Sequence, residues 1–528
     1  MLHWIKNLSL VGISVLLALS CAAQKKSQKT AESAKNIVFI AIDDLKPLLN
    51  CYGQKQMHTP NFDRLAAMGT IFTNAAVQQA VCGPSRASIM TGTYPDRTKV
   101  WDLQTDFRQS APNLISMPEY LISLGWETTA IGKIYHKGST SEGHDGKSWS
   151  IPHIVPDDYD PKYGDPAFEY YQNPETKAQF ELLIAEAEKS GKKKNAARNT
   201  AFKQLKPATE SADVSDEAYQ DGIYAKEAIK RLKMLKNGGK PFFLAVGFQK
   251  PHLPFIAPKK YWDIYDRSKI ELAPFRELAE GTPNIAYHNF GELRAFTDID
   301  DDLDVGIQLP EDKQRELIHG YMACISYVDA QLGKILDAIE AEGLSNNTVI
   351  VLWGDHGYHL GDHTLWNKHS NFEQAVRAPL MFAGPGVARN IQISQPVEMV
   401  DIFPTLFSLT NVPAPAQCEG KSLLPLLDSD DKTTLTQDYA FSQYPRKKSA
   451  MGYSIRTERY RYTEWHDNNY RTGQPYDEQN VIGVELYDYE KDPDETRNFA
   501  KNKDYKAVAA DLKAKLKARL EQSGGNKP

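Results

Sequence analysis

Cysteine is scarce in this chain. Among its 528 residues are five cysteines, Cys21, Cys51, Cys82, Cys324 and Cys418. If Cys21 serves in processing and Cys82 in chemistry, the other three allow at most one disulfide. The sequence therefore excludes a disulfide framework as the source of stability. A chain of this length can instead bury a sizeable hydrophobic core in two or more domains.

A strong net charge is also missing. The 62 basic and 68 acidic residues leave a formal net charge of −6. For a chain of this size, that value does not indicate a nucleic-acid partner, because proteins that bind nucleic acids carry a strongly basic surface. Any site for an anion must therefore be a local cluster of positive groups.

The N-terminal apolar segment is too short to cross a membrane. It runs from Leu8 to Ser20, follows Lys6, and gives way at once to a polar run. This pattern is typical of an export signal. We predict a signal peptide over residues 1–23 and a polar tether over residues 24–35.

The end of this signal is open to two interpretations. The segment Leu17–Cys21 loosely resembles a bacterial lipoprotein cleavage box. Cleavage there would end the signal at residue 20 and attach lipid to Cys21, whereas ordinary cleavage near Ala22 would leave no anchor. In both cases we expect an exported protein, located in the periplasm, at the cell surface or in the medium, that meets a membrane only through such a lipid.

Polar side chains follow apolar runs at four places. The carboxyl ends of strands are where open α/β sheets bind their ligands. Each pattern alone could also be a solvated turn or a surface residue. The four runs and the side chains after them are Asn36–Ile42 with Asp43 and Asp44, Glu127–Ile131 with Lys133 and His136, Pro241–Val246 with Lys250 and His252, and Thr348–Trp353 with Asp355 and His356.

Asp43 and Asp44 predict a metal site. Two adjacent carboxylates repel each other unless a cation lies between them, and hard divalent cations prefer oxygen ligands. Taken alone, the pair could equally be a solvated turn that caps a helix.

The stretch Cys82-Gly83-Pro84-Ser85-Arg86, followed by Met90-Thr91-Gly92, predicts a turn that leads from a strand into a helix. We place Pro84 at the first helical position, where its missing N–H costs nothing. Cys82 then lies at the positive end of the helix, beside Arg86, where its thiol pKa would fall or an anion would be stabilised. The alternative is a buried cysteine before an ordinary helix.

This motif resembles the signature of the type I sulfatases. In that family a separate enzyme, formylglycine-generating or anaerobic sulfatase-maturing, oxidises the cysteine to formylglycine (3-oxoalanine), and the hydrated aldehyde is the nucleophile. The resemblance extends from Asn36 to about residue 520. The segments Cys324–Gly333 and Trp366–Phe372 resemble the iduronate-2-sulfatase branch.

The resemblance implies a metal site and a set of catalytic residues. The metal ligands it implies are Asp43, Asp44, Cys82, Asp355 and His356. One Ca²⁺ ion is expected, with Mg²⁺ or Mn²⁺ less favoured, and one imidazole among carboxylates leaves Mn²⁺ and Zn²⁺ open. The catalytic residues implied, besides Cys82, are Arg86, Lys133, His136, His252 and Lys368.

Charge compensation assigns roles within this set. The basic side chains would neutralise the sulfate, and either His252 or His136 would protonate the leaving oxygen. Lys250 is a further candidate for sulfate contact. Trp101 and Asp102 either line a substrate cleft or cover the core.

The resemblance also implies the fold. We expect an α/β protein with an alkaline-phosphatase-like large mixed, mostly parallel sheet flanked by helices, and a small C-terminal antiparallel-sheet subdomain. We assign residues 36–425 to the catalytic domain, with insertions at 141–215 and 256–312, and residues 426–528 to the C-terminal α+β subdomain. We predict helices over Thr176–Lys189, Glu316–Glu342, Pro396–Leu406 and Tyr505–Glu521.

The expected activity is hydrolysis of a sulfate ester in a sulfated polysaccharide or oligosaccharide. A 2-O-sulfated uronic acid of a glycosaminoglycan is the first expectation for the substrate, and an algal polymer such as ulvan is the second. Two other functions stay open at this point: a phosphoester hydrolase of the alkaline-phosphatase superfamily and a non-catalytic glycan-binding protein.

Overall fold

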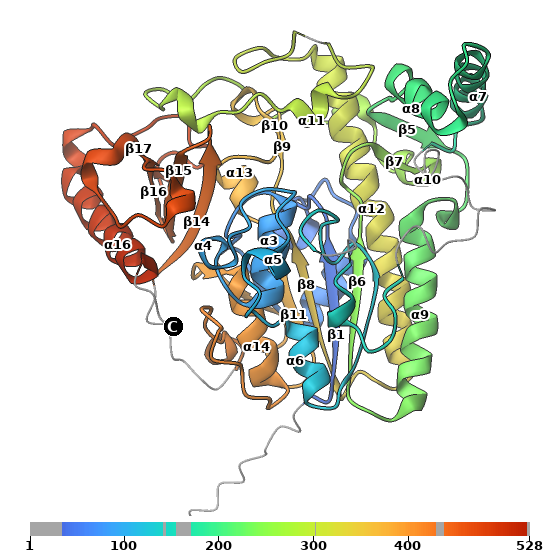
Figure 1. Cartoon of the computed structure of the whole chain (residues 1–528), viewed down its shortest axis with the longest axis horizontal. Coiled ribbons are helices and arrows are strands. Elements are labelled where there is room, and N and C mark those ends of the chain that lie inside the picture. Colours follow the sequence, from blue (N-terminus) through green and yellow to red (C-terminus); the bar gives the residue numbers. More distant parts are fainter. Residues whose placement is uncertain (1–33, 141–143, 155–170, 301, 429–437, 525–528) are drawn as a thin grey trace, which may run out of the picture.

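The computed structural model describes residues 34–140, 144–154, 171–300, 302–428 and 438–524 (Figure 1). The predicted signal peptide, Cys21 and almost all of the tether lie outside the described residues. Among the helices that are described, none combines the length and the apolar character needed to cross a membrane. The described cysteines, Cys51, Cys82, Cys324 and Cys418, are free thiols, as expected for a chain without a disulfide framework.

A seven-stranded sheet forms the centre of the molecule, in the order β12-β2-β11-β8-β1-β6-β4. Its four neighbouring strands β8, β1, β6 and β4 are parallel, and β11 is antiparallel to both β8 and β2. The bounds are β1 (Asn36–Ile42), β2 (Gly69–Phe72), β4 (Glu127–Gly132), β6 (Phe242–Phe248), β8 (Thr348–Gly354), β11 (Leu380–Ala383) and β12 (Ile391–Ile393). The expected mixed, mostly parallel sheet is confirmed.

Helices cover both faces of this sheet, which explains why β1 is apolar throughout. Val38 and Ile40 enter the core on one face, and Ile37 and Phe39 enter the core on the other. The first core is shared with α2 (Pro60–Met68), α9 (Gln220–Gly238) and α12 (Glu311–Ala341), and the second with α3 (Cys82–Thr91), α6 (Met117–Ser123) and α14 (Ile402–Leu409).

Three small two-stranded sheets and eight further helices lie within residues 75–427 of the described chain. The strand pairs are β3 (Ala75–Ala76) with β13 (Val397–Glu398), β9 (His359–Leu360) with β10 (Trp366–Asn367), and β5 (Thr209–Ala212) with β7 (Phe255–Pro258). The helices are α4 (Pro95–Thr98), α5 (Phe107–Ser110), α7 (Pro174–Lys189), α8 (Lys194–Gln204), α10 (Lys259–Trp262), α11 (Gly291–Arg294), α13 (Glu373–Val376) and α15 (Leu424–Leu427).

The C-terminal part is a four-stranded antiparallel sheet with one long helix. The strands are β14 (Tyr439–Arg446), β15 (Ala450–Thr457), β16 (Tyr460–Asp467) and β17 (Val481–Asp488), and the helix is α16 (Lys506–Gly524). In Figure 1 this sheet lies at the opposite end of the molecule from α7 and α8. The predicted small antiparallel subdomain is therefore confirmed.

Buried ion pairs join the two parts. Glu373 of α13 accepts hydrogen bonds from Arg456 of β15, at 3.1 Å, and from Arg461 of β16. All three side chains are buried. Charges buried in this way require good geometry, so these pairs fix how the C-terminal sheet sits on the part that contains the large sheet.

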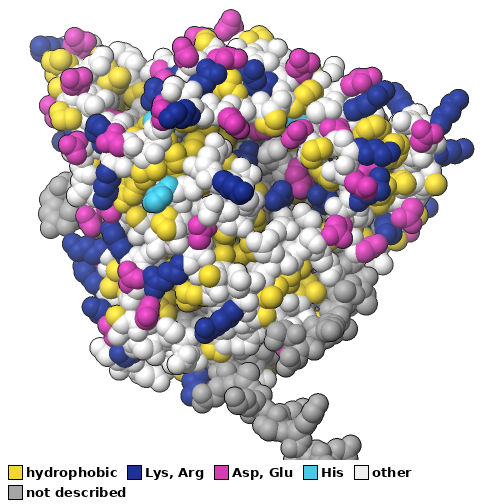
Figure 2. All heavy atoms as spheres, turned by 180° about the vertical axis from the view of Figure 1, so that it is seen from behind, with side chains coloured by type: hydrophobic (Ala, Val, Ile, Leu, Met, Phe, Trp, Pro, Cys, Tyr) yellow, Lys and Arg dark blue, Asp and Glu magenta, His cyan; other side chains and the backbone are white. Residues whose placement is uncertain are grey.

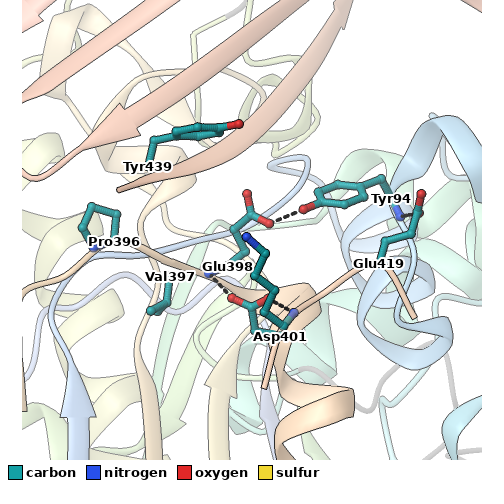
Figure 3. Close-up of a pocket in the computed structure, with 8 residues that line it drawn as sticks. Tyr94, Pro396, Val397, Glu398, Asp401, Glu419 and Tyr439 are labelled. Carbon is teal, nitrogen blue, oxygen red and sulfur yellow. Dashed lines mark hydrogen bonds between the residues drawn. The ribbon is translucent and has the colours of Figure 1, made fainter. Parts of the chain in front are cut away.

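A small pocket lies at the same junction (Figure 3). Glu398 accepts a hydrogen bond from the Tyr94 hydroxyl, and Asp401 accepts one from the backbone N–H of Glu398 at 3.0 Å. Burial raises the pKa of Asp401 to about 8. Tyr439, at the start of β14, also lines the pocket, and the lining residues include none of those at the strand ends described below.

The predicted helix over Pro396–Leu406 is wrong in its first half. Val397–Glu398 forms β13, which pairs with β3, and a single 3₁₀ turn follows before α14 begins at Ile402. Pairing with another strand has overridden the apolar spacing, which alone favoured a helix. The helices predicted at 176–189, 316–342 and 505–521 are confirmed as α7, α12 and α16.

Charged side chains of both signs are interspersed over the face that Figure 2 shows. This distribution agrees with the small net charge of the chain. A face of this kind offers no continuous basic stripe for a nucleic acid.

Glu485 makes the stability of the C-terminal sheet depend on pH. Burial raises its pKa to about 7, although Trp465 and Tyr487 donate hydrogen bonds to it. The folded protein therefore keeps a proton that the unfolded chain releases above its pKa of 4.5. Stability should fall as pH rises from 4.5 through about 7, at about 1.4 kcal/mol for each pKa unit.

Glu485→Gln is the test, because glutamine keeps the shape and stays neutral. Its amide can donate to Tyr487, whose hydroxyl lies 2.8 Å from Thr282 Oγ1 and can donate there instead. Between pH 5.5 and 8, the melting temperature of the variant should fall less than that of the wild type. Glu458→Gln, at an exposed turn of the same sheet, is the control. Equal losses in Glu485→Gln and wild type would contradict the assignment.

Candidate active site

The carboxyl ends of the four parallel strands deliver most of the predicted site residues to one place. Asp43 and Asp44 follow β1, Asp355 and His356 follow β8, Lys133 follows β4, and the Lys250–His252 loop follows β6. Because β8, β1, β6 and β4 are neighbours in the sheet, these side chains meet at a single edge, as the sequence predicted.

Helix α3 brings Cys82 to this edge. The helix begins at Cys82 itself, so Pro84 is its third residue rather than its first as expected. Cys82 Sγ lies 3.3 Å from His356 Nε2 and 3.8 Å from Lys133 Nζ. The expectation of a lowered thiol pKa is wrong: burial and the carboxylate of Asp43 raise the pKa of Cys82 well above its ordinary value, and Lys133 only partly opposes them.

The residues around Cys82 form a cluster of electron-pair donors that fits a divalent cation. His356 Nδ1 lies 3.0 Å from the Gly357 carbonyl oxygen, which fixes its proton there and leaves Nε2 with a free electron pair. That nitrogen faces Asp44 Oδ1 at 3.3 Å and Asp355 Oδ1 at 3.6 Å. Atoms that only accept hydrogen bonds repel one another at such distances, unless a cation lies between them. Asp43, Asp44, Cys82, Asp355 and His356 all belong to such groupings of candidate ligands.

Arg86 binds two of these carboxylates. Its guanidinium, fully buried, donates to Asp43 Oδ1 at 3.0 Å and to Asp355 Oδ2 at 2.8 Å. It also donates to the carbonyl oxygens of Lys133 and Ile134. The structure thus places Arg86 on the candidate metal ligands, where it binds one oxygen of each carboxylate and so orients the other.

Two lysines, Lys133 and Lys368, contact the acids beside Cys82. Lys133 Nζ lies 2.5 Å from Asp43 Oδ2, and Lys368 Nζ lies 2.9 Å from Asp44 Oδ2. Although burial opposes it, Lys133 and Arg86 hold the pKa of Asp43 well below its usual range. The site therefore keeps negative and positive groups charged side by side, which suits a doubly charged cation and an anionic ester.

The two predicted histidines differ in protonation. His136 Nδ1 accepts a hydrogen bond from the Gly138 N–H at 3.2 Å, and burial together with Lys133 lowers its pKa to about 4. His136 is therefore neutral near pH 7. For His252, burial is outweighed by Asp44 and Glu292, which raise its pKa. This difference makes His252 the better proton donor of the two.

Three weaker candidates have other partners in the structure. Lys250 Nζ donates to the carbonyl oxygens of His252 and Pro254, both at 2.7 Å, and so supports its own loop. Trp101 is buried against Tyr470 and donates to Asp96, while Asp102 binds Thr105 and Arg471. A role for Lys250, Trp101 or Asp102 in substrate binding stays a prediction.

Sequence reasoning missed Glu292. It lies in α11, inside the predicted insertion 256–312, where nothing in the pattern separates it from other acidic residues. Its carboxylate contacts His252 Nε2 at 3.0 Å and Lys368 Nζ at 2.8 Å. Glu292 thus belongs to the site by its contacts, although no motif contains it.

Comparison with protein families gives two matches. The family model described as "Sulfatase" matches residues 35–412. The model described as "N-sulphoglucosamine sulphohydrolase, C-terminal" matches residues 361–522. Together they cover both the large sheet and the C-terminal sheet.

Curated relatives agree with these matches. The chain is 34% identical to iduronate 2-sulfatase of Mus musculus over 523 residues, which covers 87% of this chain and 89% of the relative. It is 31% identical to a sulfatase of Formosa agariphila over 516 residues, which covers 96% of this chain and 90% of the relative.

Solved structures share the fold. The phosphonate monoester hydrolase of Agrobacterium radiobacter aligns with a TM-score of 0.69 at 22% identity, covering 92% of this chain and 96% of that one. A fold of this kind therefore hosts phosphonate ester chemistry as well, and the fold by itself does not identify the ester that is cleaved.

Proposed function

This chain belongs to the sulfatase family and is a sulfatase, and we propose that it removes the 2-O-sulfate of a uronic acid from a glycosaminoglycan or its oligosaccharides. One observation carries the site assignment. Asp43, Asp44, Asp355, His356, Lys133 and Lys368 all gather around Cys82, the residue that the family oxidises.

The family implies a formylglycine at position 82 and a divalent metal. A hydrated formylglycine and a bound divalent cation supply a geminal-diol nucleophile, a second hydroxyl whose collapse expels sulfate, and a Lewis acid. Asp43, Asp44, Asp355 and His356 would hold the metal, beside residue 82. We propose Ca²⁺, because three of these four ligands are hard carboxylates. Metal analysis of the purified protein tests the identity, and stoichiometric zinc would overturn it.

The remaining residues have distinct proposed roles. Lys133 and Lys368 neutralise the sulfate oxygens, and Arg86 keeps the carboxylates of Asp43 and Asp355 oriented. His252 gives its proton to the oxygen of the leaving sugar. His136 is neutral and carries its proton on Nε2, so it can donate a hydrogen bond to the substrate.

The substrate proposal rests on the iduronate 2-sulfatase relative, which aligns with 87% of this chain. The test is a panel of defined oligosaccharides, incubated with enzyme that carries formylglycine. We expect sulfate release from a 2-O-sulfated uronic acid at a kcat/KM at least about 10-fold above that for any 6-O-sulfated or N-sulfated sugar. Preference for a sulfated algal oligosaccharide such as ulvan would replace the glycosaminoglycan assignment.

Two further outcomes address the other functions. Faster hydrolysis of a phosphate ester than of the sulfate ester of the same alcohol would favour a phosphoester hydrolase. An undetectable aldehyde at position 82, together with glycan binding, would favour a non-catalytic glycan-binding protein.

We also propose that the chain is exported and matured by a partner enzyme. The short apolar segment from Leu8 to Ser20 supports export to the periplasm, the cell surface or the medium. Cys21 is the proposed lipid attachment point if the protein is anchored. A formylglycine-generating or anaerobic sulfatase-maturing enzyme would act on Cys82 before folding, because that side chain is buried in the folded protein.

A further inference from the structure

Glu292 lies between His252 and Lys368, two basic side chains of the site. It belongs to the four-residue helix α11, in which the next residue, Leu293, is buried and donates its N–H to Asn367 Oδ1 at 3.3 Å. Asn367 directly precedes Lys368. The backbone therefore ties Glu292 to the loop that carries Lys368, and its carboxylate reaches across to His252.

The contacts of His252 fix its protonation by geometry. Its Nδ1 lies 2.7 Å from the Leu253 carbonyl oxygen, and its Nε2 lies 3.0 Å from Glu292 Oε1. Both partners can only accept hydrogen bonds. Both ring nitrogens must therefore carry protons, and His252 is an imidazolium.

Other charged or titratable groups on neighbouring elements also interact with His252. They are Asp43 and Asp44 after β1, Lys368 after β10, His136 after β4, and Glu292 of α11. Of these, Glu292 makes the direct contact with the ring. The acids after β1 attract the proton on His252, and Lys368 repels it.

We propose that Glu292 is a positioning residue, whose carboxylate aligns His252 and Lys368 and keeps a proton on the His252 nitrogen that serves the leaving oxygen. This inference rests on the proposed role of His252 as the proton donor. When the S–O bond breaks, its electron pair stays on the leaving oxygen, and the Nε2 proton of His252 leaves its hydrogen bond with Glu292 and moves to that oxygen. No oxidant or reductant is needed.

The same contact restores the donor after each turnover. Once His252 has lost its proton, the free electron pair of Nε2 faces the carboxylate of Glu292 at about hydrogen-bond distance. Two acceptors at this distance repel each other, so the pair regains a proton from solvent. Both side chains are partly exposed, at 29% for His252 and 24% for Glu292, which leaves a path for that proton.

A series of aryl sulfates with leaving phenols of increasing pKa tests the proposal. A good leaving group departs without a proton, whereas a poor one needs the acid. In Glu292→Gln we expect kcat to fall less than about 3-fold for a nitrophenyl sulfate and about 100-fold for an unactivated phenyl sulfate. Glu292→Asp, which keeps the charge, should recover part of that loss. Glu311→Gln, an exposed acid of α12, is the control and should match the wild type.

A purely structural role predicts a different pattern. If Glu292 only supports the loop, all esters should lose rate equally, and that result would overturn the proposal. Inorganic sulfate binding, measured by calorimetry in a Cys82→Ala background, gives a readout without turnover. We expect Glu292→Gln to bind sulfate at least as tightly as the parent, because one competing anion is removed, and complete loss of binding would also overturn the proposal.

The test of the glycan substrate and the test of Glu292 can fail independently of each other. The aryl esters carry no uronic acid, so the comparison holds even if the glycan panel rejects a 2-O-sulfated sugar. Conversely, a uniform loss of rate across the aryl esters leaves the glycan assignment in place.

Discussion

Replacement of Cys82 by alanine is expected to abolish sulfate release without unfolding the protein. The family makes its nucleophile from this residue, and no neighbouring lysine, carboxylate or histidine can supply a hydroxyl that both attacks sulfur and releases it again. We expect kcat to fall by at least about 10⁴-fold, as when a nucleophile is removed from other hydrolases. The measurement is sulfate release from an aryl ester under saturating substrate.

Stability should change little in this variant. Only the Sγ atom is removed, and the small void that remains costs about 1 kcal/mol. The variant should therefore melt within a few degrees of the wild type. Cys324→Ala is the matched control, because Cys324 is equally buried but lies in the apolar core of α12. It should keep its activity and lose a comparable amount of stability.

Two results would contradict this prediction. The first is sulfate release by Cys82→Ala at a rate near that of the wild type. The second is mass analysis of the peptide around residue 82 in active enzyme that finds only an unmodified thiol.

The site residues at the strand ends could be predicted because a short sequence pattern marks each of them. An apolar run followed at once by acids or by Lys and His marks each of β1, β4, β6 and β8. Their order in the sheet could not be read from the chain, yet any order that keeps them parallel brings these residues to one edge. The motif around Cys82 then placed the nucleophile.

Contacts made from irregular segments could not be predicted. Glu292 lies in a short helix inside a loop-rich insertion, and its importance follows only from the position of Lys368 and His252. The partners of Arg86 and the raised pKa of Cys82 depend on how many buried carboxylates surround them. The sequence shows which charged side chains are present, whereas burial and distance decide which of them has the largest effect on a neighbour's pKa.

Arg86→Leu should be the most destabilising single change in the site. The guanidinium of Arg86 is fully buried and binds one carboxylate oxygen each of Asp43 and Asp355. Leucine fills a similar space but leaves both carboxylates buried without that partner. Breaking a buried pair in this way costs about 3–5 kcal/mol, because the remaining charge is uncompensated. Urea unfolding of the two proteins at equal metal concentration measures the difference.

Activity should be lost together with stability in Arg86→Leu, for a reason that can be tested separately. With Arg86 absent, Asp43 and Asp355 lose their fixed orientation, so the cluster should bind a divalent cation more weakly, by about 10- to 100-fold. Arg86→Lys keeps the charge but loses the paired guanidinium contacts with the two carboxylates. Its stability and cation affinity should lie between those of Arg86→Leu and wild type. Arg64→Leu is the control, since Arg64 pairs with the exposed acids Asp337 and Glu340, and should cost less than about 1 kcal/mol. If Arg86→Leu unfolded at the same urea concentration as Arg64→Leu and bound the cation as tightly, Arg86 would not be what holds the carboxylates in place.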